Sequence, residues 1–142
     1  LAVMSHRFRT ATDNTTSNGT ERVRFDSNNL TTTLRTVYTP SSAQAITAAG
    51  NTVSADASVI IINPDSDITL TSVPTIPDGV NGQIVYIRAA NTETNTLTFQ
   101  DQGTLSGSNM SLEASTRAIA STDVLTLLFD GSDWVEVAFA NN

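Results

Sequence analysis

Short apolar segments separated by turn residues constrain the fold of this chain more than any other feature. From residue 43 onward, no window keeps the 3.6-residue apolar period of an amphipathic helix. Apolar and polar residues instead alternate, as in half-buried strands, and clear examples are the segments 68–73, 83–89 and 95–100. Turn signals rich in Pro, Asp, Asn and Gly separate these segments. We therefore expect an all-β fold, a compact antiparallel β-sandwich or jelly-roll-like module.

The end of the chain predicts a β-hairpin. Two alternating segments, 124–129 and 134–140, flank the turn at 130–133, which contains Asp-Gly. An Asp-Gly turn between two such segments is among the strongest local hairpin signals. We expect Glu136 to face solvent, and Trp134 to lie on the face opposite the core. Three apolar residues of the second segment are expected to face the core: Val135, Val137 and Phe139.

Charge divides the chain into two parts. Residues 1–40 carry five Arg and three acidic residues, a net charge of +2, whereas residues 41–142 carry two Arg and eleven acidic residues, a net charge of -9. The segment 13–20 contains no apolar residue and has the composition of a loop, while 21–25 and 30–38 have strand-like composition. We predict an extended N-terminal arm over 1–40 and a β-sandwich body over 41–142.

A net-positive arm on an acidic body has two interpretations. It is either a solvated tail or an anchor that lies across an acidic neighbour, because opposite charges steer association and fix its register. In the second interpretation the arm becomes ordered only on assembly. The basic and aromatic residues that we predict for this assembly arm are Arg7, Phe8, Arg9, Arg22, Arg24, Phe25, Arg35 and Tyr38.

Composition excludes several kinds of chemistry. The chain has no Cys and no Lys, so disulfides, thiolate metal sites, a nucleophilic Cys and a Schiff-base Lys are all impossible. The longest apolar run, 59–62, is far shorter than the roughly 20 residues of a membrane-spanning helix. Arg7 and Arg9 interrupt any apolar N-terminal stretch, so we expect no secretory signal. The acidic balance argues against nucleic-acid binding, and we expect no enzyme activity and no cofactor.

Three weaker candidate sites have simpler explanations. Asn63, Asp65 and Asp67 alternate like the start of a Ca²⁺ loop, but they are also ordinary turn residues, and the Gly and distal Glu of such a loop are missing. His6 is a possible triad base, but it lies between polar and basic residues that suggest an exposed position. We expect packing, in preference to sugar stacking, for three aromatic residues: Tyr38, Tyr86 and Trp134.

Turn and strand motifs recur in five segments of the body: 68–79, 82–87, 97–101, 103–109 and 129–137. Together they resemble a β-module of bacteriophage structural proteins. Similar modules occur in capsid decoration (cement) proteins, head fibres and tail fibres, and the resemblance covers about residues 44–140 but not the arm. It implies a homotrimeric, β-rich component of the virion and no catalytic residue.

These observations predict a non-enzymatic virion protein, a homotrimer that decorates a capsid. Its partners would be further copies of itself and the major capsid protein or another virion protein, held by the arm. One alternative is a tail-fibre module that binds a receptor or a carbohydrate. Another is a subunit of an extracellular filament in which the arm donates a strand to the next copy. The residues that we predict for the subunit interface are Ile84, Tyr86, Arg88 and Trp134.

Overall fold

The computed structural model describes residues 23–25, 30–32 and 37–142, and it divides the chain into two units, Leu1–Val37 and Tyr38–Asn142. In the first unit, β1 (Val23–Phe25) and β2 (Leu30–Thr32) form an antiparallel hairpin. Both strands fall within the two segments of strand-like composition. The rest of the predicted arm, up to residue 36, lies outside the described residues.

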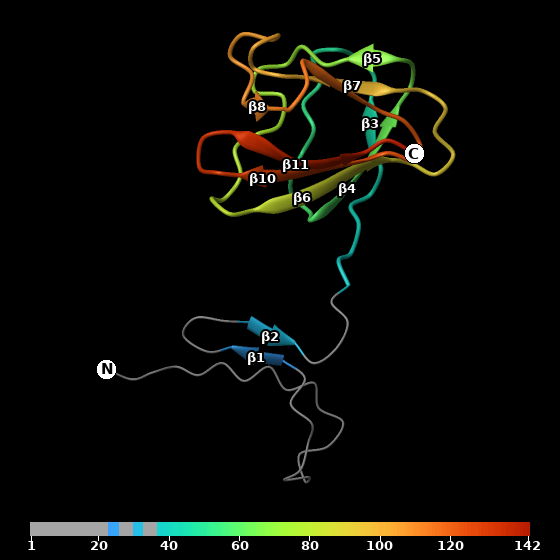
Figure 1. Cartoon of the computed structure of the whole chain (residues 1–142). Coiled ribbons are helices and arrows are strands. Elements are labelled where there is room, and N and C mark those ends of the chain that lie inside the picture. Colours follow the sequence, from blue (N-terminus) through green and yellow to red (C-terminus); the bar gives the residue numbers. More distant parts are fainter. Residues whose placement is uncertain (1–22, 26–29, 33–36) are drawn as a thin grey trace, which may run out of the picture. The chain divides into compact units, whose positions relative to one another are not determined.

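The second unit consists of two β-sheets, and no helix occurs between residues 37 and 142, so the predicted all-β class is confirmed (Figure 1). The larger sheet is curled and has six strands in the order β3-β4-β6-β10-β11-β8. The smaller sheet has three strands in the order β5-β7-β9. The strands are β3 (Gln44–Ile46), β4 (Val59–Pro64), β5 (Ile68–Thr69), β6 (Ile84–Ala89), β7 (Leu97–Gln100), β8 (Met110–Ser111), β9 (Thr116–Ile119), β10 (Val124–Phe129) and β11 (Trp134–Ala140).

The expectation of an antiparallel body is wrong, because the sheets are mixed. β10 is antiparallel to β6 and β11, and β7 is antiparallel to β9. The pairs β3–β4, β4–β6, β5–β7 and β8–β11 are parallel. Parallel neighbours need a crossover connection. Between β4 and β6 the chain forms β5 in the smaller sheet and then returns, which brings β6 back in the direction of β4.

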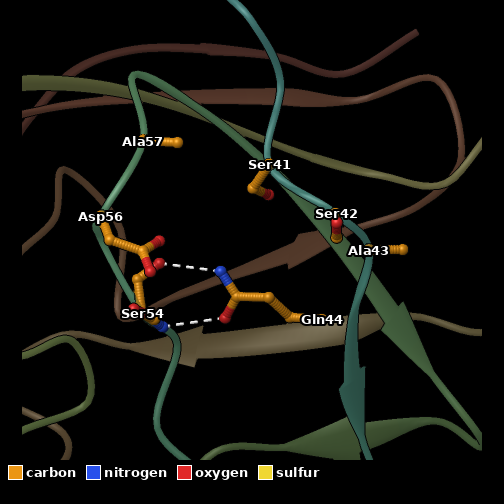
Figure 2. Close-up of a pocket in the computed structure, with 7 residues that line it drawn as sticks. All are labelled: Ser41, Ser42, Ala43, Gln44, Ser54, Asp56 and Ala57. Atoms are coloured by element: carbon orange, nitrogen blue, oxygen red, sulfur yellow. Dashed lines mark hydrogen bonds between the residues drawn. The ribbon is translucent and has the colours of Figure 1, made fainter.

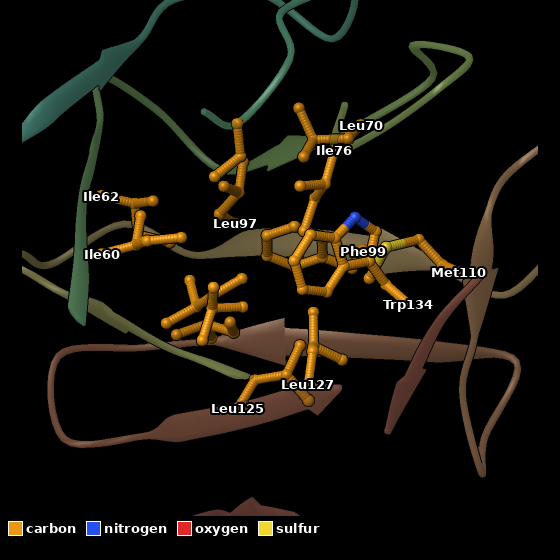
Figure 3. Packing of buried hydrophobic residues seen from close by; sticks show 14 of the residues in the cluster. Ile60, Ile62, Leu70, Ile76, Leu97, Phe99, Met110, Leu125, Leu127 and Trp134 are labelled. Atoms are coloured by element: carbon orange, nitrogen blue, oxygen red, sulfur yellow. The ribbon is translucent and has the colours of Figure 1, made fainter. Parts of the chain in front are cut away.

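The hydrophobic core lies between the two sheets (Figure 3). In β6 every second residue, Val85, Ile87 and Ala89, is fully buried, as the alternation of the sequence predicts. Leu97 and Phe99 of β7 enter the core from the smaller sheet. Each large apolar side chain buried in this way contributes about 1.5–3 kcal/mol. The other fully buried large side chains are Ile46, Ile60, Ile62, Leu70, Ile76, Met110, Ile119, Leu125, Leu127 and Trp134.

A β-bulge in β11 overturns the predicted orientation of the last strand. Thr126 pairs with Ala138, but the next residue of β10, Leu127, pairs with Glu136, so the register skips Val137. The bulge reverses the alternation, because one extra residue moves the side chains that precede it to the other face. Trp134 and Glu136 therefore point inward, and Val137 is 59% exposed. Only Phe139 packs against the core as expected.

Candidate functional site

The side of the six-stranded sheet that faces away from the core is largely apolar, and we call it the outer sheet face. Its residues alternate with the buried residues of the four longest strands of the sheet. They are Val59, Ile61, Asn63, Ile84, Tyr86, Arg88, Val124, Thr126, Leu128, Val135, Ala138 and Ala140. An exposed apolar surface of this kind is typical of protein-binding sites.

The strand register joins the apolar residues of this face into a continuous surface. Ile84 of β6 lies opposite Leu128 of β10, which in turn lies opposite Val135 of β11. Tyr86 lies beside Val59 of β4 on its other side. Directly opposed side chains on one sheet face are in contact distance. Ile84 is 45% exposed even so, which leaves its side chain available to a partner.

The beginning of the second unit lies beside β4, and the Tyr38 ring lies near this face. The ring of Tyr38 lies 6.2 Å from the ring of Tyr86, measured between centroids, and its side chain is 52% exposed. Pro40 forms a parallel bridge with Val59, and the Ser41 amide donates a 2.8 Å hydrogen bond to the Val59 carbonyl. The structure thus brings together Tyr38, predicted for the arm, and Tyr86, predicted for the interface.

Arg88 is the single charged side chain of the outer sheet face. Its two terminal nitrogens each donate a 2.7 Å hydrogen bond to the Asn91 side-chain oxygen. Carboxylates are absent from this face. Apart from Glu136, which points inward from β11, those of the second unit lie in the turns and loops around the sheets. The exposed acidic residues of the second unit are Asp56, Asp65, Asp67, Asp78, Glu113 and Asp130.

Three of the four residues predicted for the subunit interface, Ile84, Tyr86 and Arg88, lie on the outer sheet face, but the assignment of Trp134 to a surface needs correction. Its side chain is fully buried, and the indole nitrogen donates a 3.1 Å hydrogen bond to the Pro77 carbonyl. Its ring lies 5.1 Å from that of Phe129 (Figure 3). The bulge turns this residue into the core. For the same reason it does not join the two tyrosines in an exposed aromatic platform.

The remaining residues of the predicted assembly arm lie outside the described side chains. Arg24 and Phe25 belong to β1, where only the backbone is described, and His6 also falls outside the described residues. Their predicted contacts therefore stay predictions. The same holds for Arg7, Phe8, Arg9, Arg22 and Arg35.

Sequence reasoning missed an ion pair that joins the two sheets. The Glu136 side chain of β11 is only 4% exposed, and its carboxylate accepts a 2.7 Å hydrogen bond from the guanidinium of Arg117 on β9. The same guanidinium lies 5.0 Å from the centre of the Phe139 ring. Its hydrogen bond with Glu136 raises the pKa of Arg117 above its usual value. The available signal was that Arg117 is one of only two Arg in the body.

A shallow polar hollow lies beside the start of β3 (Figure 2). The Gln44 side chain spans it, donating to the Ser54 carbonyl at 2.8 Å and accepting from the Ser54 amide at 2.9 Å. Asp56 supplies the hollow's single charged side chain. The hollow has neither a second carboxylate nor an aromatic ring, so it offers no acid–base pair and no stacking surface. Its lining residues are Ser41, Ser42, Ala43, Gln44, Ser54, Asp56 and Ala57.

Asn63 belongs to β4, and Asp65–Asp67 form the bend between β4 and β5. Asp67 accepts hydrogen bonds from the amide (2.8 Å) and the hydroxyl (3.0 Å) of Thr96, so its carboxylate ties this turn to the start of β7. Within the part of the chain that the structure describes, no group of three or more His, Cys, Asp or Glu side chains could hold a metal ion. The same residues contain no helix long and apolar enough to cross a membrane.

Neither a family model, nor a curated protein, nor a solved structure matches this sequence.

Proposed function

We propose that this chain is a non-enzymatic structural protein of a virus particle, a homotrimer that decorates the capsid. The observation that carries the proposal is the outer sheet face, which is largely apolar, partly exposed and free of carboxylates. The cores of protein interfaces are depleted of charged residues in the same way. The described residues thus offer a surface for binding protein. We interpret the two facing sheets as a variant of the jelly-roll-like fold, which suits a component of a virion.

In this proposal residues 1–40 anchor the protein to the major capsid protein or another virion protein. The excess of Arg in this segment favours an acidic partner surface. Tyr38, Pro40 and Ser41 already contact the body. We therefore place the anchoring residues before Tyr38.

The open edge of β11 is unsuited to a filament made by strand donation at that edge. β8 pairs with only the first two residues of β11, Trp134 and Val135. After Val135, β11 pairs with β10 alone among the described strands, so its other edge is open. That edge carries a bulge at Val137 and the inward-pointing charge of Glu136. Bulges and inward charges are the features by which natural sheets prevent the addition of another strand.

Co-sedimentation with virus particles assembled without this chain tests the proposal. We expect the full chain to bind such particles at saturable, regularly spaced sites, and a variant consisting of residues 38–142 to remain in the supernatant. Binding of the truncated variant with unchanged affinity would contradict the anchoring role. Failure of the full chain to bind, together with binding to a glycan array, would instead support a tail-fibre module.

A further inference from the structure

We infer that Asn81 is a site of spontaneous deamidation, and that opening of the turn at residues 80–83 controls its reaction. Asn81 is the single Asn of residues 41–142 that is followed by Gly, and both Asn81 and Gly82 are exposed. Neither the chemistry of this pair nor the hydrogen bonds that hold it depend on the proposed function.

The reaction needs only the chain itself and water. The backbone nitrogen of Gly82 forms a bond with the side-chain carbonyl carbon of Asn81. That carbon releases its amide nitrogen as ammonia, which carries away the proton of the Gly82 nitrogen. Water then opens the resulting succinimide ring at either of its two carbonyl groups, and the product is Asp or isoAsp. Glycine in the second position favours ring closure, because it has no side chain to obstruct the attack.

The folded turn holds the attacking nitrogen away from this reaction. The Gly82 amide donates a 2.8 Å hydrogen bond to the Phe129 carbonyl, and the Phe129 amide donates a 2.9 Å hydrogen bond to the Gln83 carbonyl. The Gln83 amide closes the turn with a 2.7 Å hydrogen bond to the Val80 carbonyl, and the φ of Gly82 is 87°, as in a type II turn. For the ring to close, the Gly82 nitrogen has to leave Phe129 and rotate towards the Asn81 side chain.

The side chain of Gln83 makes this turn harder to open. Its Oε1 accepts a 2.9 Å hydrogen bond from the Val80 amide, and its Nε2 donates a 2.7 Å hydrogen bond to the Ala55 carbonyl. The side chain thus ties the turn to the loop that precedes β4. Opening an exposed turn costs less free energy than unfolding the whole domain. Asn81 therefore reacts during local opening, while the core stays folded.

The reaction changes the surroundings of the turn. The Asn81 side chain lies against the turn of the last hairpin, where a Cβ atom on Gly131 would be 3.4 Å from the Asn81 amide nitrogen. Deamidation places a negative charge beside this second turn, which already contains Asp130 and Asp133. The isoAsp product also lengthens the backbone of the 80–83 turn. The modification thus weakens the end of β6 that lies next to the hairpin.

Peptide mapping by mass spectrometry, after incubation of the full chain at neutral pH, tests the inference. The chain unfolded in urea gives the reference rate, and the other Asn-Gly pair of the sequence, Asn18–Gly19, is an internal standard for the same chemistry in urea. We expect Asn81 to deamidate at least about tenfold more slowly in the folded chain than in urea. In the folded chain it should still react faster than any other Asn of residues 41–142.

Gln83→Ala tests the control by the turn, because it removes the two side-chain hydrogen bonds and leaves the Asn-Gly pair intact. It should raise the rate at Asn81 about threefold or more in the folded chain and leave the rate in urea unchanged. Gln100→Ala is the matched control, because this side chain bonds to the Leu70 carbonyl instead, and the rate at Asn81 should not change. Circular dichroism checks that each variant is folded.

Three results would overturn the inference. They are equal rates at Asn81 in the folded and the unfolded chain, faster reaction at another Asn of residues 41–142 in the folded chain, and an unchanged rate in a folded Gln83→Ala variant. The first two are measured on the unmodified chain, so they decide the question even if Gln83→Ala does not fold.

Discussion

At the scale of single residues, Gly79 shows how closely the buried indole is packed. A Cβ atom at this position would lie 2.8 Å from the Trp134 ring and 2.8 Å from the Gln83 side-chain oxygen. Trp134 cannot retreat easily, because its ring nitrogen is bonded to the Pro77 carbonyl and its ring packs on Phe129. This crowding explains why the position needs a residue without a side chain.

We therefore expect Gly79→Ala to lower the free energy of unfolding by about 1–3 kcal/mol, the usual cost of overpacking a core. Gly50→Ala is the matched control, because a Cβ atom there would meet nothing within 4 Å. Chemical denaturation of the two variants measures the difference. Equal stability of both variants would show that the indole does not pack against this turn.

Asp130 stabilises the turn of the last hairpin. Its carboxylate accepts hydrogen bonds from the amides of Asp133 (2.8 Å) and Ser132 (2.9 Å), and these bonds lower the pKa of Asp130 below its ordinary value of 3.8. A carboxyl group with a lowered pKa stabilises the fold above its ordinary pKa and loses this effect as the pH falls through the lowered value.

Asp130→Ala should accordingly destabilise the protein near pH 7. We expect the difference in unfolding free energy between this variant and the unmodified chain to shrink as the pH falls below 3.8. Denaturation curves recorded across this pH range measure it. A difference that stays constant with pH would mean that the ionised carboxylate contributes nothing to the turn.

At the scale of secondary-structure elements, the Arg117–Glu136 pair connects β9 and β11, strands of different sheets that share no backbone ladder. Removing one partner of a buried pair leaves the other charge uncompensated, which costs more than the pair itself contributes. We expect Arg117→Met to lower the free energy of unfolding by about 3 kcal/mol. Arg88→Met, which replaces the other Arg of the body, should lower the free energy of unfolding by less than about 0.5 kcal/mol.

Calorimetric or chemical unfolding of the Arg117→Met, Glu136→Met and double variants separates this effect from lost packing. The double variant should be more stable than the sum of the single changes predicts, because it leaves no unpaired charge between the sheets. Strictly additive losses would contradict a direct interaction between the two side chains.

The elements also show where sequence reasoning ends. Alternation predicts β6, β7 and the β10–β11 hairpin, since each depends on local period and turn chemistry. The outward position of Ile84, Tyr86 and Arg88 follows from the same pattern. The parallel pairing of β4 with β6 depends on a path through the other sheet, which no local pattern encodes. The bulge at Val137 is also local, but one inserted residue is enough to turn the side chains of Trp134 and Glu136 to the opposite face of the sheet.

At the scale of the whole molecule, the second unit contains all of the hydrophobic core that the structure describes. Every core residue among those described lies between Ile46 and Trp134. A chain of residues 38–142 should therefore unfold cooperatively, within a few degrees of the full chain. Differential scanning calorimetry of both chains tests this, and a loss of the cooperative transition on truncation would show that the first unit is needed for the fold.

The native mass of the full chain tests the central claim, assembly into a closed structural oligomer, most directly. Native mass spectrometry at the higher concentrations of a dilution series should show a single species of three chains, each of 15.0 kDa. The trimer should dissociate on dilution and not grow at high concentration, because a closed ring leaves no free contact. A monomer at every concentration, or an open series of larger assemblies, would contradict the proposed trimer.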